Sequence, residues 1–168
     1  SDEFHGRDAE ATFNLLSTDE SYTGESYKDA ASQRVIDFAG FESLYGGSAA
    51  DIFNIKGSHS ADLYGQGGND FFNFLGTGTL TGFIDGGIGI DSLDYSGYDS
   101  PRAINLTSLG AIDGFNGTEA SISNEFRNIN RLVGSNQADS LQGLSSDSTW
   151  LITGTVNGYE TEGRSIQY

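Results

Sequence analysis

The chain contains no cysteine and only one proline among its 168 residues. Without cysteine there can be no disulfide, no zinc-thiolate cluster and no thiol nucleophile, and cysteine usage says nothing about the compartment. No apolar run approaches the ~20 residues that a membrane-spanning helix needs, and no secretory signal segment is recognisable. We therefore expect no membrane span within this sequence.

Basic residues are scarce as well, because 8 Lys and Arg stand against 24 Asp and Glu, for a formal net charge of -16. Binding to nucleic acid depends on clustered Lys and Arg that neutralise phosphates, so nucleic acid is excluded as a partner. Two interpretations of the acidity stay open. The carboxylates keep the protein soluble by self-repulsion, or some of them are ligands for a hard cation such as Ca²⁺.

Glycine is abundant, with 24 residues, and 36% of the chain is hydrophobic. This composition predicts an all-β chain dense in turns, and its length suits one domain with a core of its own. We expect a single module over residues 1–168, interrupted by irregular insertions near residues 23–34 and 97–118. Within the first insertion, residues 26–32 are predicted to form either a short helical turn or a surface loop.

Residues 86–94 read GGIGIDSLD and match the nonapeptide G-G-x-G-x-D-x-U-x, where U is a large apolar residue, at every fixed position. The pattern is that of a calcium-binding turn followed by a short strand. Weaker copies occupy residues 65–73 and 46–54, and the weakest copy occupies residues 134–142. The motif therefore forms a graded internal repeat.

The spacing of the three best turns predicts the fold. Gly46, Gly65 and Gly86 begin them, 19 and 21 residues apart. Short apolar segments at 52–55, 61–64, 71–75, 79–84, 92–95 and 103–106 alternate like strands between them and beyond. We expect a right-handed parallel β-solenoid with about 20 residues per coil, in which the turns stack on one edge.

Alternation within these segments indicates which side chains face the interior. Phe72 and Phe74 share one parity, as do Leu93 and Tyr95 of a later strand. Other aromatic residues at strand positions are also predicted to pack in the core: Phe13, Phe38, Phe41, Phe53 and Trp150.

The composition of the turns fits calcium chemistry. Glycine permits the backbone curvature that directs carbonyl oxygens toward one point, and aspartate adds a charged oxygen. Calcium takes six to eight oxygen ligands, so two stacked turns are needed. The predicted site is formed by Asp70 and Asp91, with Gly65, Gly67, Gly86 and Ile88 supplying backbone, and a second site by Asp51 with Asp70. In the alternative, the turns hold no ion and each aspartate accepts hydrogen bonds from neighbouring backbone N–H groups.

A longer internal repeat overlies these turns. Residues 38–47 resemble residues 126–135, and residues 11–22 resemble residues 148–159 at an offset of 137. Residues 35–38 match residues 165–168 at an offset of 130. Because the end of the chain repeats its beginning, we expect it to be one module of a longer repetitive protein.

The glycine-rich turns, in an acidic and cysteine-free chain, resemble the RTX (hemolysin-type) calcium-binding β-roll family, in the degenerate long-repeat form of very large bacterial surface or secreted proteins. Residues 93–98, 104–106, 126–129 and 149–154 resemble the connecting segments of such repeats. The resemblance covers roughly residues 38–154 and includes one perfect nonapeptide. It implies calcium as cofactor and folding outside the cell. RTX turns recur every nine residues on both edges, whereas these recur near every 20, which favours a single-edged arrangement.

The expected function is therefore that of a non-catalytic, calcium-stabilised spacer or adhesin segment at the cell surface or secreted, with adjoining repeats as partners. The alternative is a module that binds or modifies extracellular polysaccharide, for which Tyr95, Tyr98 and Asp99 beside Arg102 are the candidate groove. No G-x-S-x-G nucleophile motif and no P-loop is present.

Overall fold

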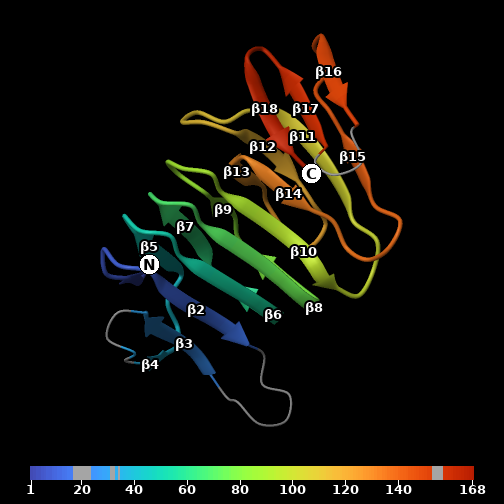
Figure 1. Cartoon of the computed structure of the whole chain (residues 1–168). Coiled ribbons are helices and arrows are strands. Elements are labelled where there is room, and N and C mark those ends of the chain that lie inside the picture. The colour runs from blue at the N-terminus through green and yellow to red at the C-terminus, as the bar shows by residue number, and fades with distance from the viewer. Residues whose placement is uncertain (17–23, 31–32, 34, 153–156) are drawn as a thin grey trace.

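The computed structural model describes residues 1–16, 24–30, 33, 35–152 and 157–168. These residues form strands and turns only (Figure 1). The strands are β1 (Glu3–His5), β2 (Ala11–Leu16), β3 (Gly24–Asp29), β4 (Val35–Phe38), β5 (Ser43–Gly47), β6 (Ile52–Ser60), β7 (Asp62–Gln66), β8 (Phe71–Thr81), β9 (Ile84–Asp85), β10 (Ser92–Tyr98), β11 (Ala103–Leu109), β12 (Phe115–Thr118), β13 (Phe126–Ile129), β14 (Arg131–Val133), β15 (Ser140–Gln142), β16 (Ser148–Leu151), β17 (Gly158–Thr161) and β18 (Arg164–Gln167).

The strands form two sheets. The eight-stranded sheet has the order β1-β5-β7-β9-β13-β12-β11-β15, and the ten-stranded sheet has the order β16-β17-β18-β14-β10-β8-β6-β2-β3-β4. Between β5 and β10 the chain alternates between the two sheets (Figure 1). Two successive strands therefore add one strand to each sheet.

Parallel pairing in the middle of both sheets follows the spacing of the glycine turns. In the ten-stranded sheet Phe72 of β8 pairs with Phe53 of β6 on one side and with Leu93 of β10 on the other. In the eight-stranded sheet Leu63 of β7 pairs with Leu44 of β5 and with Ile84 of β9. Like residues therefore stack on like residues from one crossing to the next.

The prediction of a right-handed parallel β-solenoid was wrong, because both sheets are mixed. At one end of the ten-stranded sheet β2, β3 and β4 are antiparallel, and at the other end β16, β17 and β18 are antiparallel. In the eight-stranded sheet β12 runs antiparallel to both β11 and β13. The repeat spacing governs β5 to β10 only. The antiparallel strands at the two ends of the ten-stranded sheet have no glycine-turn motif. Pairing between consecutive strands therefore sets the direction of these strands.

Several local predictions are confirmed. Strands occupy residues 52–55, 71–75, 92–95 and 103–106, and longer stretches around them. The helical turn that was one reading of residues 26–32 is wrong as far as these residues are described, because β3 extends to Asp29. Residues 17–22 and 153–156 of the 11–22 and 148–159 repeat lie outside the described residues, as do parts of the first insertion.

The core lies between the sheets and is rich in aromatic rings. Phe13, Phe53 and Phe72 are fully buried and stack in a column, with ring centroids 4.6 and 4.9 Å apart. Phe74 and Tyr95 form a second stacked pair at 5.0 Å. The predicted inward residues Leu93 and Tyr95 are completely buried, whereas Trp150 is 42% exposed. Burial of several aromatic rings supplies a large part of the stability of such a fold.

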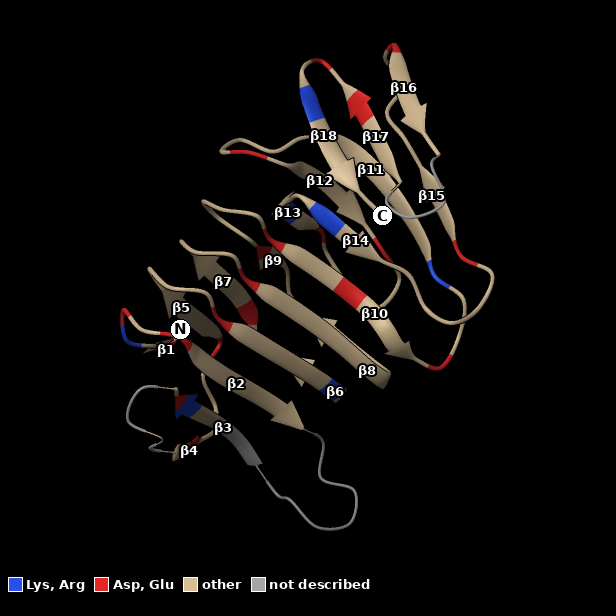
Figure 2. Ribbon diagram, in the orientation of Figure 1, with Lys and Arg blue, Asp and Glu red and all other residues tan. Residues whose placement is uncertain are grey.

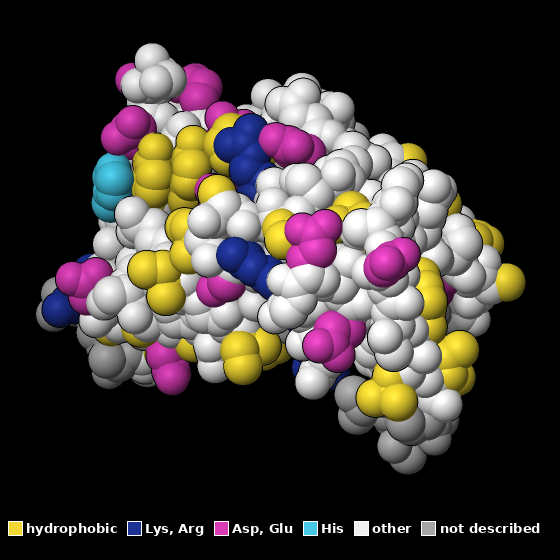
Figure 3. Space-filling model, turned by 90° about the horizontal axis from the view of Figure 1, so that it is seen from above, with side chains coloured by type: hydrophobic (Ala, Val, Ile, Leu, Met, Phe, Trp, Pro, Cys, Tyr) yellow, Lys and Arg dark blue, Asp and Glu magenta, His cyan; other side chains and the backbone are white. Residues whose placement is uncertain are grey.

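Acidic side chains lie scattered over the surface among uncharged ones, with few Lys or Arg (Figure 3). The surface in that view thus carries the net negative charge without gathering it into one patch. The described part of the chain contains no helix that could cross a membrane.

Candidate metal centre

Three aspartates form a ladder at the start of neighbouring strands of the ten-stranded sheet. Asp51, Asp70 and Asp91 directly precede β6, β8 and β10, and acidic segments line up there (Figure 2). All three residues are completely buried. The Asp51 N–H donates to Oδ1 of Asp70 over 2.8 Å, and the Asp70 N–H donates to Oδ1 of Asp91 over 2.9 Å. We call Asp51, Asp70 and Asp91 the aspartate ladder.

Neutral groups close both ends of the aspartate ladder. The Ala11 N–H donates to Oδ1 of Asp51 over 2.8 Å, and the Asp91 N–H donates to Oδ1 of Asn130 over 3.1 Å. One side-chain oxygen of each aspartate, Oδ1, thus accepts a backbone N–H of the neighbouring strand or of the residue just before it. Asn130 shows that a neutral amide side chain can take the same place as an aspartate.

The second carboxylate oxygen of each aspartate is different. Oδ2 of Asp51, Asp70 and Asp91 is buried and has no hydrogen-bond partner among the described residues. It lies against the first glycine of its own turn, because a Cβ on Gly46, Gly65 or Gly86 would come within 2.6 Å of it. Only glycine leaves space for this approach. The first glycine of each turn is therefore required because a side chain there would collide with the carboxylate. The positive φ angles occur instead at later glycines of the turns, such as Gly87 with φ of 94°.

Burial raises the pKa of all three carboxyl groups above the ordinary value of 3.8. The pKa of Asp51 is about 7, that of Asp70 about 8 and that of Asp91 about 6. Loss of solvation disfavours the ionised form, and the backbone hydrogen bonds to Oδ1 offset this only in part. For Asp70 the charges of Asp91 and Asp51 raise the pKa further. At neutral pH part of the aspartate ladder is therefore protonated unless a cation is bound.

The other predicted ligands are placed as follows. The carbonyl oxygen of Gly86 lies 2.5 Å from the position of a Cβ on Gly65, on the same side as Oδ2 of Asp70. Gly67 and Ile88 form a parallel bridge in the outer part of the turns. The Ile88 carbonyl accepts the Gly68 N–H over 3.0 Å. The structure thus brings Gly65, Gly86 and the aspartates together and leaves Gly67 and Ile88 outside that cluster.

The donor set fits calcium only in part. In the residues that the structure describes, no three His, Asp or Glu side chains are arranged to hold a metal. A calcium ion at these turns would need backbone carbonyl oxygens for most of its six to eight ligands. The buried, unpartnered Oδ2 atoms and the glycine spaces beside them are the features that favour such an ion.

Sequence reasoning missed Asp113, which lies in the irregular insertion at residues 97–118. Its Oδ2 accepts the Gly89 N–H over 3.2 Å, and its charge raises the pKa of Asp91. Oδ1 of Asp113 is buried and has no hydrogen-bond partner within the described part of the chain. It was missed because no spacing signal links it to the turns. Asn130 could have been found, since Asn130 and Leu132 repeat the spacing of Asp91 and Leu93.

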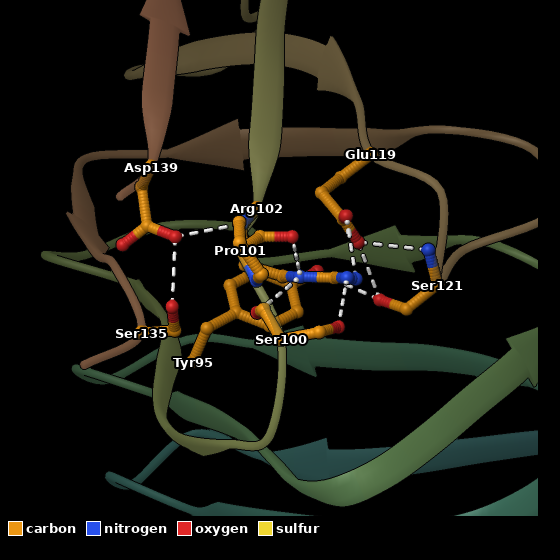
Figure 4. Close-up of polar contacts among 8 residues, drawn as sticks. All are labelled: Tyr95, Ser100, Pro101, Arg102, Glu119, Ser121, Ser135 and Asp139. Atoms are coloured by element: carbon orange, nitrogen blue, oxygen red, sulfur yellow. Dashed lines mark hydrogen bonds and ion pairs between the residues drawn. The ribbon is translucent and has the colours of Figure 1, made fainter. Parts of the chain in front are cut away.

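Asp139 of the weakest turn reproduces the local geometry but is exposed. Its Oδ1 accepts the Arg102 N–H over 2.6 Å and the Ser135 hydroxyl over 2.8 Å (Figure 4). Its Oδ2 again lies close to the first glycine of the turn, Gly134. The turn therefore folds in the same way without burying a carboxylate.

Three of the four residues proposed for a polysaccharide groove, Tyr95, Tyr98 and Arg102, belong to one network of contacts, whereas Asp99 is exposed. The Arg102 guanidinium lies 4.1 Å from the ring centroid of Tyr98. It also donates to Glu119 over 3.0 Å (Figure 4). Glu119 is almost completely buried and also accepts the Ser121 N–H over 2.8 Å, and the Tyr95 hydroxyl is hydrogen-bonded to Ser121. These groups satisfy one another beneath the surface. Comparison with family models, with curated proteins and with solved structures gives no match for this chain.

Proposed function

We propose that this chain is a non-catalytic repeat module of a large extracellular or cell-surface bacterial protein, where it serves as spacer or adhesive segment. Calcium stabilises the folded module by binding at the aspartate ladder. The observation that carries this proposal is the set of three buried Oδ2 atoms that have no hydrogen-bond partner in the part of the chain that the structure describes. A buried carboxylate without a partner is costly, and a cation removes that cost.

Asp70 and Asp91 are the principal charged ligands in this proposal, and Asp51 with Asp70 forms the second candidate pair. Because each Oδ1 already accepts a backbone N–H, each aspartate offers one oxygen to the ion. Sites with so few carboxylate oxygens bind calcium weakly. Weak sites suit an extracellular module, where dissociation constants on the order of 10⁻⁴ to 10⁻³ M are typical.

The alternative, a module that binds or modifies polysaccharide, finds less support. Such a site needs polar and aromatic groups that face an open groove. Tyr95 is completely buried, and Arg102 is paired with Glu119 and covers Tyr98. We therefore keep spacer or adhesin as the proposed function.

Titration calorimetry with CaCl₂ at pH 7 tests calcium binding. Binding should release protons, because the pKa values of the aspartate ladder lie between about 6 and about 8. The measured heat should then depend on the ionisation enthalpy of the buffer. Asp91→Asn should weaken binding and reduce the proton release.

Asp139→Asn is the matched control, since Asp139 has the same turn geometry but is exposed. We expect it to bind calcium as the unchanged chain does. No binding at millimolar calcium, or a loss of binding in Asp139→Asn but not in Asp91→Asn, would contradict the proposal.

A further inference from the structure

The two ends of the ten-stranded sheet are built in the same way. We call β2, β3 and β4 the N-terminal meander and β16, β17 and β18 the C-terminal meander. Each consists of three consecutive antiparallel strands. They lie at opposite ends of the sheet (Figure 1).

The strand pairing aligns the two meanders residue by residue. Tyr27 of β3 pairs with Phe13 and Ile36, and Tyr159 of β17 pairs with Trp150 and Ile166. The outer two positions of these cross-strand rows keep the offsets of the sequence repeat, 137 from Phe13 to Trp150 and 130 from Ile36 to Ile166, whereas Tyr27 and Tyr159 in the middle strands are 132 residues apart. The ring geometry agrees, since Phe13 and Tyr27 are 4.9 Å apart and Trp150 and Tyr159 are 4.7 Å apart, both edge to face.

The correspondence extends into the eight-stranded sheet. At the same offset of 137, β1 (Glu3–His5) corresponds to β15 (Ser140–Gln142), strand for strand. β1 and β15 are the two end strands of that sheet. The last four strands of the chain therefore reproduce its first four strands in both sheets.

The two meanders are attached through opposite strands. The N-terminal meander joins the sheet by its first strand, β2, which pairs with β6 and leaves β4 at the edge. The C-terminal meander joins by its third strand, β18, which pairs with β14 and leaves β16 at the edge. The burial of matching side chains in the two meanders follows this difference in attachment. Phe13 is fully buried where Trp150 is 42% exposed, and Ile166 is fully buried where Ile36 is 53% exposed.

Each meander thus shows the contact that the other one lacks. We infer that the outer edge of β4, the last strand of the ten-stranded sheet as described, is the docking site for the β14 strand of a preceding unit of the same kind, joined head to tail. In the same arrangement β1 pairs with β11 of the preceding unit, as β15 does here. One meander then joins two units, with its first strand on the following unit and its third strand on the preceding one. This inference rests on the proposed repeat module but not on calcium.

The exposed apolar side chains support this occupant. Val35 and Ile36 on β4 are more than half exposed, as are Leu151 at the end of β16 and Ile152 directly after it. Edge strands that carry apolar side chains invite pairing with another strand. Most other exposed large hydrophobic residues, such as Ile88 and Ile112, lie in turns.

The test is a tandem chain in which residues 1–147 are followed directly by residues 11–168. In it the N-terminal meander of the second unit replaces the C-terminal meander of the first. Arg131 and Gln167 are direct neighbours across β14 and β18, and Gln167 corresponds to Asp37. We introduce Arg131→Cys in the first unit and Asp37→Cys in the second. Because the natural chain has no cysteine, only this disulfide can form within the tandem.

The reference is the single 168-residue chain with Arg131→Cys and Gln167→Cys. The disulfide in the tandem chain should form to the same extent as the disulfide in this reference. Arg131→Cys with Val35→Cys in the second unit is out of register and should not crosslink. As a second readout, the Ile36→Cys thiol of the second unit should be alkylated roughly tenfold more slowly than in the single chain. The Val35→Cys thiol should stay reactive in both, because Ser165 at the matching position is exposed.

Three results would overturn the inference. The reference chain does not crosslink, the reference chain crosslinks but the tandem chain does not, or the tandem chain fails to fold. The crosslink should form in EDTA as well as in calcium. A failed calcium titration therefore leaves this result standing, and a failed crosslink leaves calcium binding untouched.

Discussion

Asp70→Asn removes the ionisable group with the highest pKa from the aspartate ladder. The amide keeps an oxygen that accepts the Asp51 N–H, as the Asn130 side chain does for Asp91. The change replaces a buried Oδ2 that has no partner within the described residues by a neutral group. We expect the variant to be more stable than the natural chain at high pH without calcium.

The magnitude follows from the pKa. Because the folded-state pKa of Asp70 is about 8, above the unfolded value of 3.8, its stabilising contribution is complete below pH 3.8 and is lost as the pH rises through about 8. Each pKa unit corresponds to about 1.4 kcal/mol, and structural relaxation reduces the total, so we expect the loss to be on the order of 2–5 kcal/mol. For a chain of this size that is roughly 5–15 °C in the unfolding midpoint.

The assay is urea and thermal unfolding at pH 5, 7 and 9 in EDTA. The natural chain should lose stability steadily over this range. Asp70→Asn should lose less, because only Asp51 and Asp91 of the aspartate ladder still titrate, and it should exceed the natural chain at pH 9. Asp139→Asn, at the exposed turn, should keep the pH dependence of the natural chain. If Asp70→Asn has the same pH dependence as the natural chain, or is less stable at pH 9, the reasoning about the buried carboxylate is refuted.

Two further substitutions test the structure by unfolding measurements. Gly65→Ala should lower the free energy of unfolding by about 2–4 kcal/mol, because its Cβ would meet the turn's carboxylate oxygen and a backbone carbonyl. Gly158→Ala has only an ordinary contact at 3.6 Å and should lower it by less than about 1 kcal/mol. Equal losses would contradict the close approach at Gly65. Glu119→Ala should lower the free energy of unfolding by about 3–5 kcal/mol, because it leaves the largely buried Arg102 guanidinium without its ion-pair partner. Glu125→Ala, which removes an exposed ion pair, should lower it by about 1 kcal/mol or less. A small loss for Glu119→Ala would show that the network is solvated.

The sequence predicted the middle of the fold well because one physical signal repeats there. The spacing of Gly46, Gly65 and Gly86 equals the offset between the paired strands β6, β8 and β10. Alternation also identified Phe72, Leu93 and Tyr95 as buried. The ends were mispredicted because strand direction there depends on hairpin pairing, and neither β3 nor β17 follows a glycine turn. Parallel stacking was extended beyond the segment that encodes it.

The candidate site was predicted in its residues more than in its geometry. Asp51, Asp70 and Asp91 lie in one column as expected, and their Oδ1 atoms accept backbone N–H groups, which was the alternative to calcium. Their Oδ2 atoms are buried, which no spacing could reveal. Trp150, predicted to be in the core, is partly exposed because β16 is an edge strand. The tandem experiment tests the matching contact at the other end of the sheet, the burial of Ile36.

The most direct test of the central claim is the unfolding midpoint at pH 8 in millimolar calcium against EDTA, with magnesium as the control ion. In 10 mM calcium, about 10 to 100 times a dissociation constant of 10⁻³ to 10⁻⁴ M, binding stabilises the folded state by about 1.4–2.7 kcal/mol, so we expect calcium to raise the midpoint by roughly 3–10 °C. Magnesium should do less, and the gain from calcium should shrink at pH 5, where protons occupy the aspartate ladder. Identical midpoints in calcium and in EDTA at pH 8 would contradict the account.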